Sequence, residues 1–219
     1  MQRIAVLASG GLDSSVLLVE LAREAVVFPV HVAMGMIWEA EELTALRRFI
    51  ARVGNPNIQP VTELALPIGP VYGTHWSLSG RGVPSLGTPD EDVYLPGRNL
   101  LLLGLAGVWG SLQGVSAVAI GSLACNPFPD GSTEFFASYA QVMSQGLAHP
   151  LQVLAPYRGV DKHRLIQRFH DLPLELTLTC MQPVAGVHCG RCSKCGERHQ
   201  AFVDAGVVDR TAYTHPLKS

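Results

Sequence analysis

The sequence predicts an α/β fold, with a parallel doubly wound sheet followed by a small C-terminal module that binds zinc through four cysteines. Three observations support this prediction. Short apolar segments alternate with helical segments, an order that gives a parallel sheet covered on both faces. A glycine-rich turn joins the first strand to the first helix, and four of the five cysteines lie within residues 180–195. We therefore expect an α/β domain over residues 1–175 and a metal module over residues 176–219 that packs on it.

The first part of the chain predicts three strands and two helices. Residues 3–8 predict a short buried strand through their apolar run, residues 25–34 predict a second strand, and residues 58–66 fit a third. Residues 14–23 have apolar side chains on a face that would lie on a sheet. Residues 39–53 begin with acidic side chains and end with arginines, which suits the helix dipole.

The alternation continues after a long polar stretch. Residues 67–98 are rich in Gly, Pro, Ser and Thr and predict a long loop, which in a compact domain usually serves a function. The remaining expected elements are helices at 100–109, 133–145, 161–170 and 196–205, strands at 117–120 and 151–154, and an extended piece at 175–178.

The composition favours a globular protein that acts on a small molecule. The 219 residues are 47% hydrophobic and 16% charged, with 16 basic and 18 acidic residues and a net charge of −2. That balance gives no basic field to attract nucleic acid. No apolar run approaches the roughly 18 residues that span a bilayer, and the N-terminus lacks the pattern of a signal peptide. We therefore expect a cytoplasmic protein that binds neither nucleic acid nor membrane.

The turn after the first strand is predicted to bind phosphate. It consists of Ser9, Gly10, Gly11, Leu12, Asp13, Ser14 and Ser15. Adjacent glycines adopt backbone angles that let successive N–H groups surround an anion, and the following helix adds its positive end. Asp13 would repel a bare phosphate, so it indicates a divalent cation or a polarised turn. The alternative is an ordinary strand-to-helix turn with a capping residue.

Two common phosphate loops fit this turn poorly. The P-loop requires a Gly-Lys-Ser/Thr string, and the turn has no lysine. The dinucleotide fingerprint requires the spacing G-x-G-x-x-G. The turn resembles instead the SGGxDS loop (PP-loop) of the ATP pyrophosphatases, which split ATP into AMP and pyrophosphate to activate a substrate oxygen. This resemblance implies an adenine nucleotide α-hydrolase-like fold, with residues 1–175 as the PP-loop ATP-binding domain.

The clustered cysteines are predicted to hold a metal ion. They are Cys180, Cys189, Cys192 and Cys195, separated by eight, two and two residues. Tight C-x-x-C turns aim pairs of thiolates at one ion, and four thiolates suit tetrahedral Zn²⁺ with no open position for water. We therefore expect one structural zinc ion per chain.

Other interpretations of the cysteines stay open at this point. They are a [4Fe–4S] cluster, a pair of disulfides, and thiols for sulfur transfer. His188 is expected to be a neighbour of the cluster rather than a ligand. The isolated Cys125 is expected to be a buried packing residue.

Strings along nearly the whole chain resemble the 7-cyano-7-deazaguanine synthases of queuosine biosynthesis. They are SGGLDSS at 9–15, YLPGRNLLLL at 94–103, IGSLA at 120–124, FPDGSTEFF at 128–136, ELTLTC at 175–180 and HCGRCSKCGER at 188–198. The resemblance implies an ATP-dependent ligase that converts 7-carboxy-7-deazaguanine and ammonia to 7-cyano-7-deazaguanine through an adenylated intermediate. It also implies bound zinc, Mg²⁺ with the ATP, and a homodimer.

The resemblance further implies site residues outside the glycine loop. Arg98 and Asn99 match the PGRN segment beside the nucleotide and substrate, and a guanidinium binds phosphate or carboxylate through two N–H groups. Lys162 matches a lysine that steadies phosphate charge, so Asp13, Arg98 and Lys162 are the expected catalytic residues. Asp130 and Glu134 are expected to hold Mg²⁺ or to recognise the edge of a base. Without the resemblance, these side chains fit ordinary cap or surface positions.

Three segments depart from the family pattern. Residues 128–132 read Phe-Pro-Asp-Gly-Ser where the family has Tyr-Pro-Asp-Cys-Arg, residues 34–38 lack its Tyr-Gly-Gln-x-His stretch, and the loop at 67–93 is unlike it. We expect all three segments, the first within residues 125–134, to face the substrate. The alternatives are a PP-loop enzyme that forms an amide or conjugate on another carboxylate, a PP-loop tRNA-modifying enzyme, and a nucleotide-sensing zinc protein without turnover.

Overall fold

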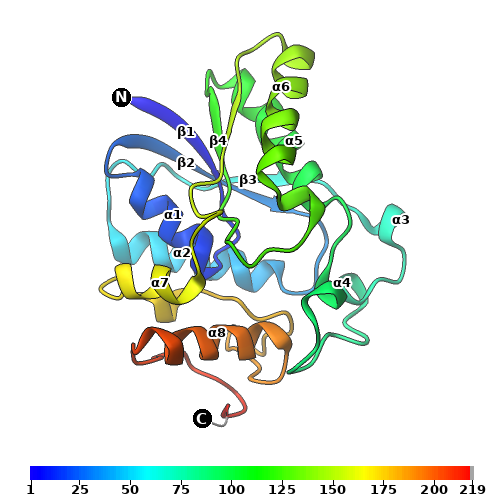
Figure 1. The fold of residues 1–219 in the computed structure, drawn as a ribbon, viewed down its shortest axis with the longest axis vertical. Coiled ribbons are helices and arrows are strands. Elements are labelled where there is room, and N and C mark those ends of the chain that lie inside the picture. The colour runs from blue at the N-terminus through cyan, green and yellow to red at the C-terminus, as the bar shows by residue number, and fades with distance from the viewer. Residues whose placement is uncertain (218–219) are drawn as a thin grey trace.

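A parallel β-sheet forms the centre of the protein (Figure 1). The computed structural model describes residues 1–217. The five strands found there are β1 (Gln2–Leu7), β2 (Ala25–Ala33), β3 (Thr62–Ala65), β4 (Ala117–Ala119) and β5 (Gln152–Leu154), in the order β3-β2-β1-β4-β5. Each neighbouring pair is parallel, with Ala5 of β1 opposite both Phe28 of β2 and Val118 of β4. The predicted parallel α/β fold is confirmed.

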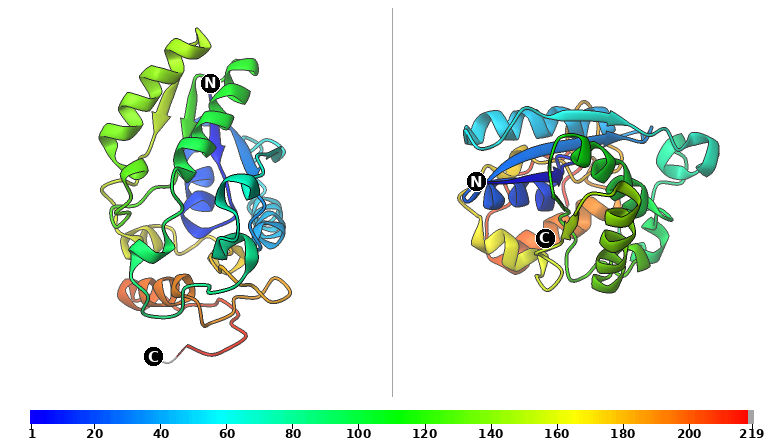
Figure 2. Two further views of the ribbon diagram at one scale, coloured as in Figure 1. Left: turned by 90° about the vertical axis from the view of Figure 1, so that its right-hand side faces the viewer. Right: turned by 90° about the horizontal axis from the view of Figure 1, so that it is seen from above.

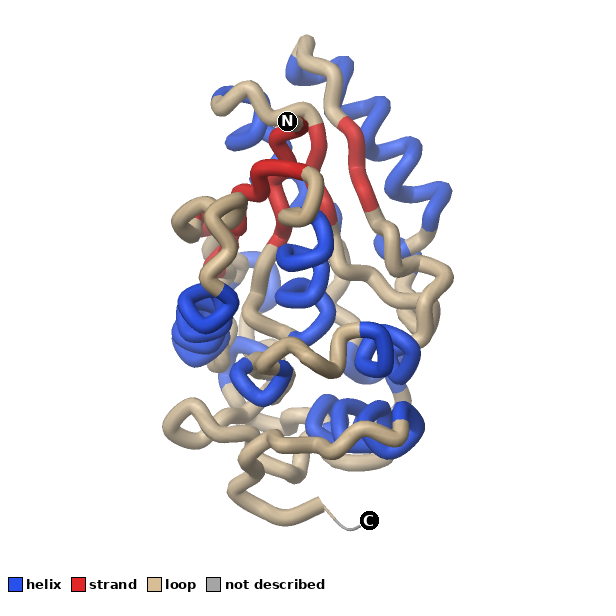
Figure 3. Tube along the Cα trace, turned by 90° about the vertical axis from the view of Figure 1, so that its left-hand side faces the viewer, coloured by secondary structure: helices blue, strands red, loops and turns tan. Residues whose placement is uncertain are grey.

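Helices cover the two faces of this sheet (Figure 3). The longer ones are α1 (Leu12–Leu21), α2 (Glu39–Val53), α5 (Arg98–Leu112), α6 (Thr133–Leu147), α7 (Lys162–Arg168) and α8 (Ser193–Ala205). Ile4 and Val6 share an apolar cluster with α1, α2 and α7, whereas Ala5 and Leu7 share another with α5 and α6. Successive residues of a strand point to opposite faces, so β1 is buried on both sides.

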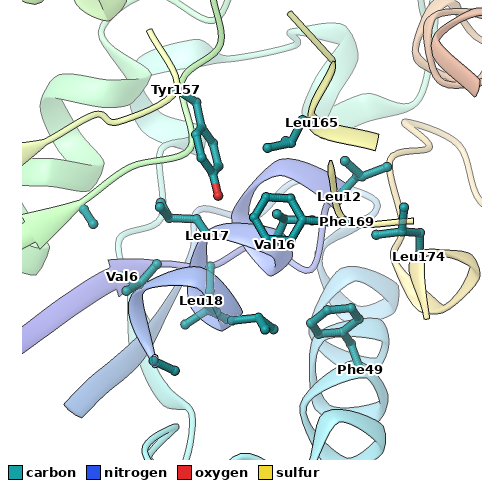
Figure 4. Packing of buried hydrophobic residues seen from close by; sticks show 14 of the residues in the cluster. Val6, Leu12, Val16, Leu17, Leu18, Phe49, Tyr157, Leu165, Phe169 and Leu174 are labelled. Carbon is teal, nitrogen blue, oxygen red and sulfur yellow. The ribbon is translucent and has the colours of Figure 1, made fainter. Parts of the chain in front are cut away.

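The core beneath the glycine loop is closely packed (Figure 4). Leu17 and Leu18 of α1 are fully buried, and Phe49 of α2 is buried beside them in the same cluster. The ring of Tyr157 packs there too, and its hydroxyl donates to Glu20 Oε2 at 2.5 Å. This core fixes the start of α1, and with it the glycine loop, relative to the sheet.

Short elements account for most differences from the predicted secondary structure. The stretch expected to be a loop contains α3 (Gly69–Tyr72), α4 (Trp76–Ser79) and the 3-10 turn η1 (Asp90–Val93), and a further turn, η2 (Pro129–Gly131), precedes α6. The strand expected at 58–66 is shorter, because Pro60 has no N–H for the ladder and Ile58 forms only an isolated bridge to Val27.

The prediction of an extended segment at residues 175–178 was wrong for the first half of that segment. Leu174–Leu176 forms the 3-10 turn η3 after Pro173. The turn is held by Arg198, a fully buried side chain of α8 whose Nη2 donates to the Leu174 carbonyl at 2.7 Å. Residues beyond η3 then run past the glycine loop toward the cysteines. Within residues 1–217, no helix is both long and apolar enough to cross a bilayer.

Candidate nucleotide site and metal centre

The glycine loop lies where β1 ends between β2 and β4, the point of an open parallel sheet at which ligands bind. Gly10 has φ of 94°, and a Cβ at this position would lie 2.2 Å from the carbonyl oxygen of Glu42. The Gly11 N–H donates to Ser9 Oγ at 3.1 Å, and Ser14 Oγ donates to the Gly11 carbonyl at 3.2 Å. The first N–H groups of a helix have no acceptor within it, so the start of α1 suits an anion.

A cavity of about 340 Å³ opens beside this loop. Such a volume is in the range of small-molecule sites. The expected site residues that line it are Ser9, Gly11, Leu12, Asp13, Ser14, Arg98, Asn99, Asp130 and Lys162. Gly10 and Ser15 are buried and do not line the cavity, and Glu134 is exposed in the first turn of α6, away from the cavity lining.

Charged side chains of alternating sign form a row in the cavity wall. Lys162 Nζ lies 3.5 Å from Asp13 Oδ2 and donates to Glu197 Oε1, while Lys194 Nζ donates to Glu197 Oε2 at 2.5 Å. Burial alone would lower the pKa of Lys162, but Asp13 and Glu197 raise it above its ordinary value. Burial likewise works against ionised Glu197, but the two lysines lower its pKa to about 2. Lys162 and Glu197 therefore stay charged at neutral pH.

Asp13 keeps one oxygen for another ligand. Its Oδ1 is buried and has no hydrogen-bond partner among the described residues. Burial raises the pKa of Asp13, and Lys162 partly offsets that effect. Mg²⁺ prefers carboxylate oxygens and usually binds one or two of them together with phosphates. The donor set at the loop therefore fits a magnesium ion that accompanies a nucleotide.

Asp130 holds the start of α5. Its Oδ2 accepts the Asn99 N–H at 2.9 Å, and its carbonyl accepts from Asn99 Nδ2 at 3.1 Å. Burial raises the pKa of Asp130, and the bond from Asn99 offsets part of that rise. A carboxylate at a helix start satisfies orphan N–H groups and suits the helix dipole. Asp130 thus anchors the turn that carries Arg98, whose buried Nε has no partner among the described residues.

The three segments that depart from the family pattern meet at the cavity. Trp38 and Trp76 stack with ring centroids 5.7 Å apart, and Phe128 stacks on Tyr94 at 4.8 Å. Trp38, Trp76 and Phe128 line the cavity. Flat aromatic faces favour a planar partner. We call Trp38, Trp76 and Phe128 the aromatic wall.

Two further cavity residues were not among the site residues expected from the sequence. Glu42 is buried in the lining, and burial raises its pKa to about 8 although Arg98 acts to lower it. Its position on the same helix face as Leu46 and Phe49 was a readable sign of burial. Cys125, expected to be buried, is exposed and lines the cavity, because it lies in the loop that follows β4 at the ligand edge of the sheet.

The four clustered cysteines have the geometry of one tetrahedral metal site. All four are buried, and their Sγ atoms lie within 4.8 Å of one another. The Sγ separations are 3.9 Å for Cys180 and Cys192, 3.9 Å for Cys189 and Cys195, and 3.5 Å for Cys192 and Cys195. A tetrahedral ion with bonds of about 2.3 Å to sulfur requires separations of roughly 3.8 Å. Each of the five cysteines is a free thiol, so the disulfide interpretation is wrong.

His188 is a neighbour of the cluster, as expected. Its Nε2 accepts the Thr179 N–H at 3.1 Å, and its ring lies against Tyr213. Burial, followed by the charge of Arg198, lowers the pKa of His188 to about 3, so the imidazole is neutral. It orders the chain around the metal centre and is not part of the cysteine set.

Strand order, glycine loop and cysteine set together define an α/β protein of the PP-loop class with a metal-binding module. Comparison with known proteins narrows this class. The chain belongs to the QueC family: the family described as "Queuosine biosynthesis protein QueC" matches residues 3–206. The resemblance inferred from the sequence strings is therefore confirmed.

Curated relatives align over almost the full chain. The 7-cyano-7-deazaguanine synthase of Methanothrix thermoacetophila is 30% identical over 98% of this chain and 100% of its own length. The 7-cyano-7-deazaguanine synthase of Methanothermobacter thermautotrophicus is 30% identical over 97% of this chain and 99% of its own length. A solved structure of a predicted tRNA methyltransferase subunit from Methanocaldococcus jannaschii covers 75% of this chain and 72% of its own, with 16% identity and a TM-score of 0.49.

Proposed function

We propose that the protein makes 7-cyano-7-deazaguanine from 7-carboxy-7-deazaguanine and ammonia, with ATP as the activating substrate. The observation that carries the proposal is the near full-length alignment with relatives named for this product. The cavity supports it, because it joins an anion loop to an aromatic wall suited to a planar base.

The chemistry requires activation because a carboxylate oxygen is a poor leaving group. The carboxylate attacks the α-phosphorus of ATP, which forms an acyl adenylate and releases pyrophosphate. Ammonia then displaces AMP to give the amide. A second ATP adenylates the amide oxygen and releases a second pyrophosphate. The bond between carbon and that oxygen then breaks, AMP leaves with the oxygen, and loss of two protons gives the nitrile.

The residues of the chain would act mainly by binding and orientation. N–H groups of the glycine loop would hold the departing pyrophosphate, and Lys162 would balance its charge. Arg98 would orient the acid or a phosphate through paired N–H groups. Mg²⁺, when bound, draws charge from the phosphates, and Asp13 would hold it. Zn²⁺ on the four cysteines would stabilise the module that carries Glu197.

Turnover of the named acid tests the proposal. Metal-loaded protein is incubated with 7-carboxy-7-deazaguanine, ammonium and Mg-ATP, and AMP and the nitrile are measured by chromatography with mass detection. We expect both products from the wild type. Asp13→Ala should keep its fold and metal content and lose both products. A wild type that forms neither AMP nor nitrile would reject the proposal.

A second candidate is a PP-loop enzyme that forms an amide or conjugate on another carboxylate. The observation that favours it is the meeting of all three divergent segments at one cavity, where Trp38 and Trp76 stand. AMP release with a different acid, and none with 7-carboxy-7-deazaguanine, would select this candidate. A tRNA-modifying activity is disfavoured by the net charge of −2, and a salt-sensitive complex with tRNA would revive it.

We also propose that the protein acts in the cytoplasm as a homodimer. The reducing cytoplasm keeps thiols free to bind metal, which suits five free cysteines. Ammonia would come from solution or from a partner.

A further inference from the structure

Helix α8 starts on the metal centre. Cys192 is its N-cap residue, and Cys195 lies in its first turn. An ion bound by these two thiolates would fix both the position and the direction of the start of the helix. Figure 1 shows α8 lying across one end of the molecule beneath α7. Glu197 follows Cys195 by two residues and lines the nucleotide cavity.

The metal module also touches the nucleotide site at two other points. The Leu178 N–H donates to the Gly10 carbonyl at 2.8 Å, so the segment leading to Cys180 holds the glycine loop directly. The Ser193 N–H donates to the Pro84 carbonyl at 3.0 Å, which ties the 67–93 segment to the start of α8. The module is therefore joined to the loop, to Lys162 and to a segment of the cavity wall.

We propose that Glu197 is a positioning residue for Lys162, and that the metal centre sets the geometry of the nucleotide site through it. Lys162 has two carboxylate partners: Glu197, with which it forms a short contact, and Asp13 at 3.5 Å. Glu197 draws the ammonium group away from Asp13. Asp13 then keeps an oxygen for the cation that accompanies ATP. This inference rests on the proposed ATP chemistry.

The packing of α8 does not depend on Glu197. The helix is held by apolar side chains, Ala201, Phe202 and Ala205, which share a core cluster with Leu165 and Ile166 of α7. Lys194 Nζ holds the other oxygen of Glu197. Replacing the carboxylate by an amide of the same size should leave the helix in place and release Lys162.

The chain offers a direct readout, because its only lysines are Lys162, Lys194 and Lys218. Metal-loaded wild type, Glu197→Gln and Glu197→Asp are treated briefly with an amine-acylating reagent. Modification of Lys162 is measured by mass spectrometry relative to the same peptide from denatured protein. The matched control is Asp204→Asn, an exposed carboxylate on the same helix that bonds Gln200.

In Glu197→Gln we expect acylation of Lys162 to rise at least threefold, with metal content unchanged and with a lower Tm but a fold that is retained at the assay temperature. Pyrophosphate binding, measured by calorimetry, should weaken about tenfold. Glu197→Asp should restore part of the protection of Lys162 from acylation and part of the affinity for pyrophosphate. Asp204→Asn should behave as wild type. Removal of the metal from the wild type should reproduce the rise in acylation of Lys162.

The proposal would be overturned if metal-loaded Glu197→Gln showed acylation of Lys162 within twofold of wild type and pyrophosphate affinity within twofold of wild type. These two measurements need no turnover. They therefore remain decisive if the acid proposed above is not the substrate. Loss of product formation in the wild type would reject only the proposed reaction.

Discussion

Glu42 places a carboxyl group inside the cavity beside the glycine loop, where burial works against its charge. The Glu42 side chain lies on the buried face of α2. The backbone carbonyl oxygen of Glu42 occupies the space that a Cβ on Gly10 would need. Its pKa is raised from 4.5 to about 8 by burial, despite the charge of Arg98. The folded protein therefore holds a proton on Glu42 over a pH range in which the unfolded chain releases it.

This proton makes stability depend on pH. The contribution of Glu42 is fully present below pH 4.5 and is lost as pH rises through about 8. One pKa unit corresponds to about 1.4 kcal/mol, so a rise from 4.5 to about 8 predicts that Glu42→Gln gains about 4 kcal/mol of stability relative to wild type between pH 5 and pH 9. Urea unfolding at pH 5, 7 and 9 measures this gain. The exposed Glu24→Gln serves as control, and an equal difference at pH 5 and pH 9 would contradict the assignment.

Gly121 lets the loop after β4 approach the glycine loop. A Cβ on Gly121 would lie 3.1 Å from both the Asp13 carbonyl carbon and the Ser14 nitrogen. Because these are backbone atoms, Gly121→Ala should shift the glycine loop by a few tenths of an ångström and lower turnover about tenfold. Initial rates at saturating ATP test this. Gly146→Ala, with open space around its Cβ, should keep the wild-type rate.

The sequence predicted the local part of the site and missed the part built by tertiary contacts. The glycine loop and the cysteines are short strings whose chemistry depends on spacing, so they were readable. Glu197 contacts Lys162, and the backbone carbonyl of Glu42 lies close to Gly10. Both partners are distant in the chain, and spacing does not reveal such contacts. The assignments of catalytic and substrate residues stay predictions.

At the scale of elements, long periodic segments were predictable and short ones were not. The expected helix at 39–53 coincides with α2, because acidic residues start it and Gly54 ends it with φ of 62°. Helices α3 and α4 have four residues each, too few for a period to show. The division at residue 175 stays a prediction, and Arg198 of α8 links its two sides by donating to the carbonyl of Leu174.

Metal removal should act first on α8. An ion at a hundredfold excess over its Kd stabilises a protein by about 2.7 kcal/mol, or about 5–10 °C in Tm for a chain of this size. We expect chelation to lower Tm by at least that amount, and elemental analysis to find one zinc ion per chain before treatment. Cys192→Ser should lose the ion, whereas Cys125→Ser should retain it. An unchanged Tm after complete removal of metal would contradict a structural ion.

At the scale of the whole molecule, α5 and α6 stand beside the sheet at the end away from α8 (Figure 2). Large apolar side chains are exposed on them, with Val108 at 44%, Leu112 at 78% and Val142 at 63%. A second copy of the chain would cover this face in the proposed homodimer. Contiguous exposed apolar side chains commonly mark such interfaces.

Light scattering after size exclusion tests the dimer. We expect about twice the chain mass of 23.5 kDa for the wild type, and a monomer for the double variant Val108→Glu, Leu112→Glu. Val208→Glu, at an equally exposed position after α8, should stay dimeric. A wild type that is monomeric at high concentration would exclude the homodimer.

The hydrogen bond from Leu178 to Gly10 has a consequence for how the protein is made. It joins Gly10 to a segment that is translated much later, and Glu197, which contacts Lys162, is translated later still. Contacts between segments so far apart in the chain form slowly, and N-terminal parts emerge first during synthesis. In a ribosome-bound chain, the glycine loop would thus lack these two contacts and would not yet bind a nucleotide. Competence to bind ATP would begin only when α8 has left the ribosome and the four cysteines have bound a metal ion.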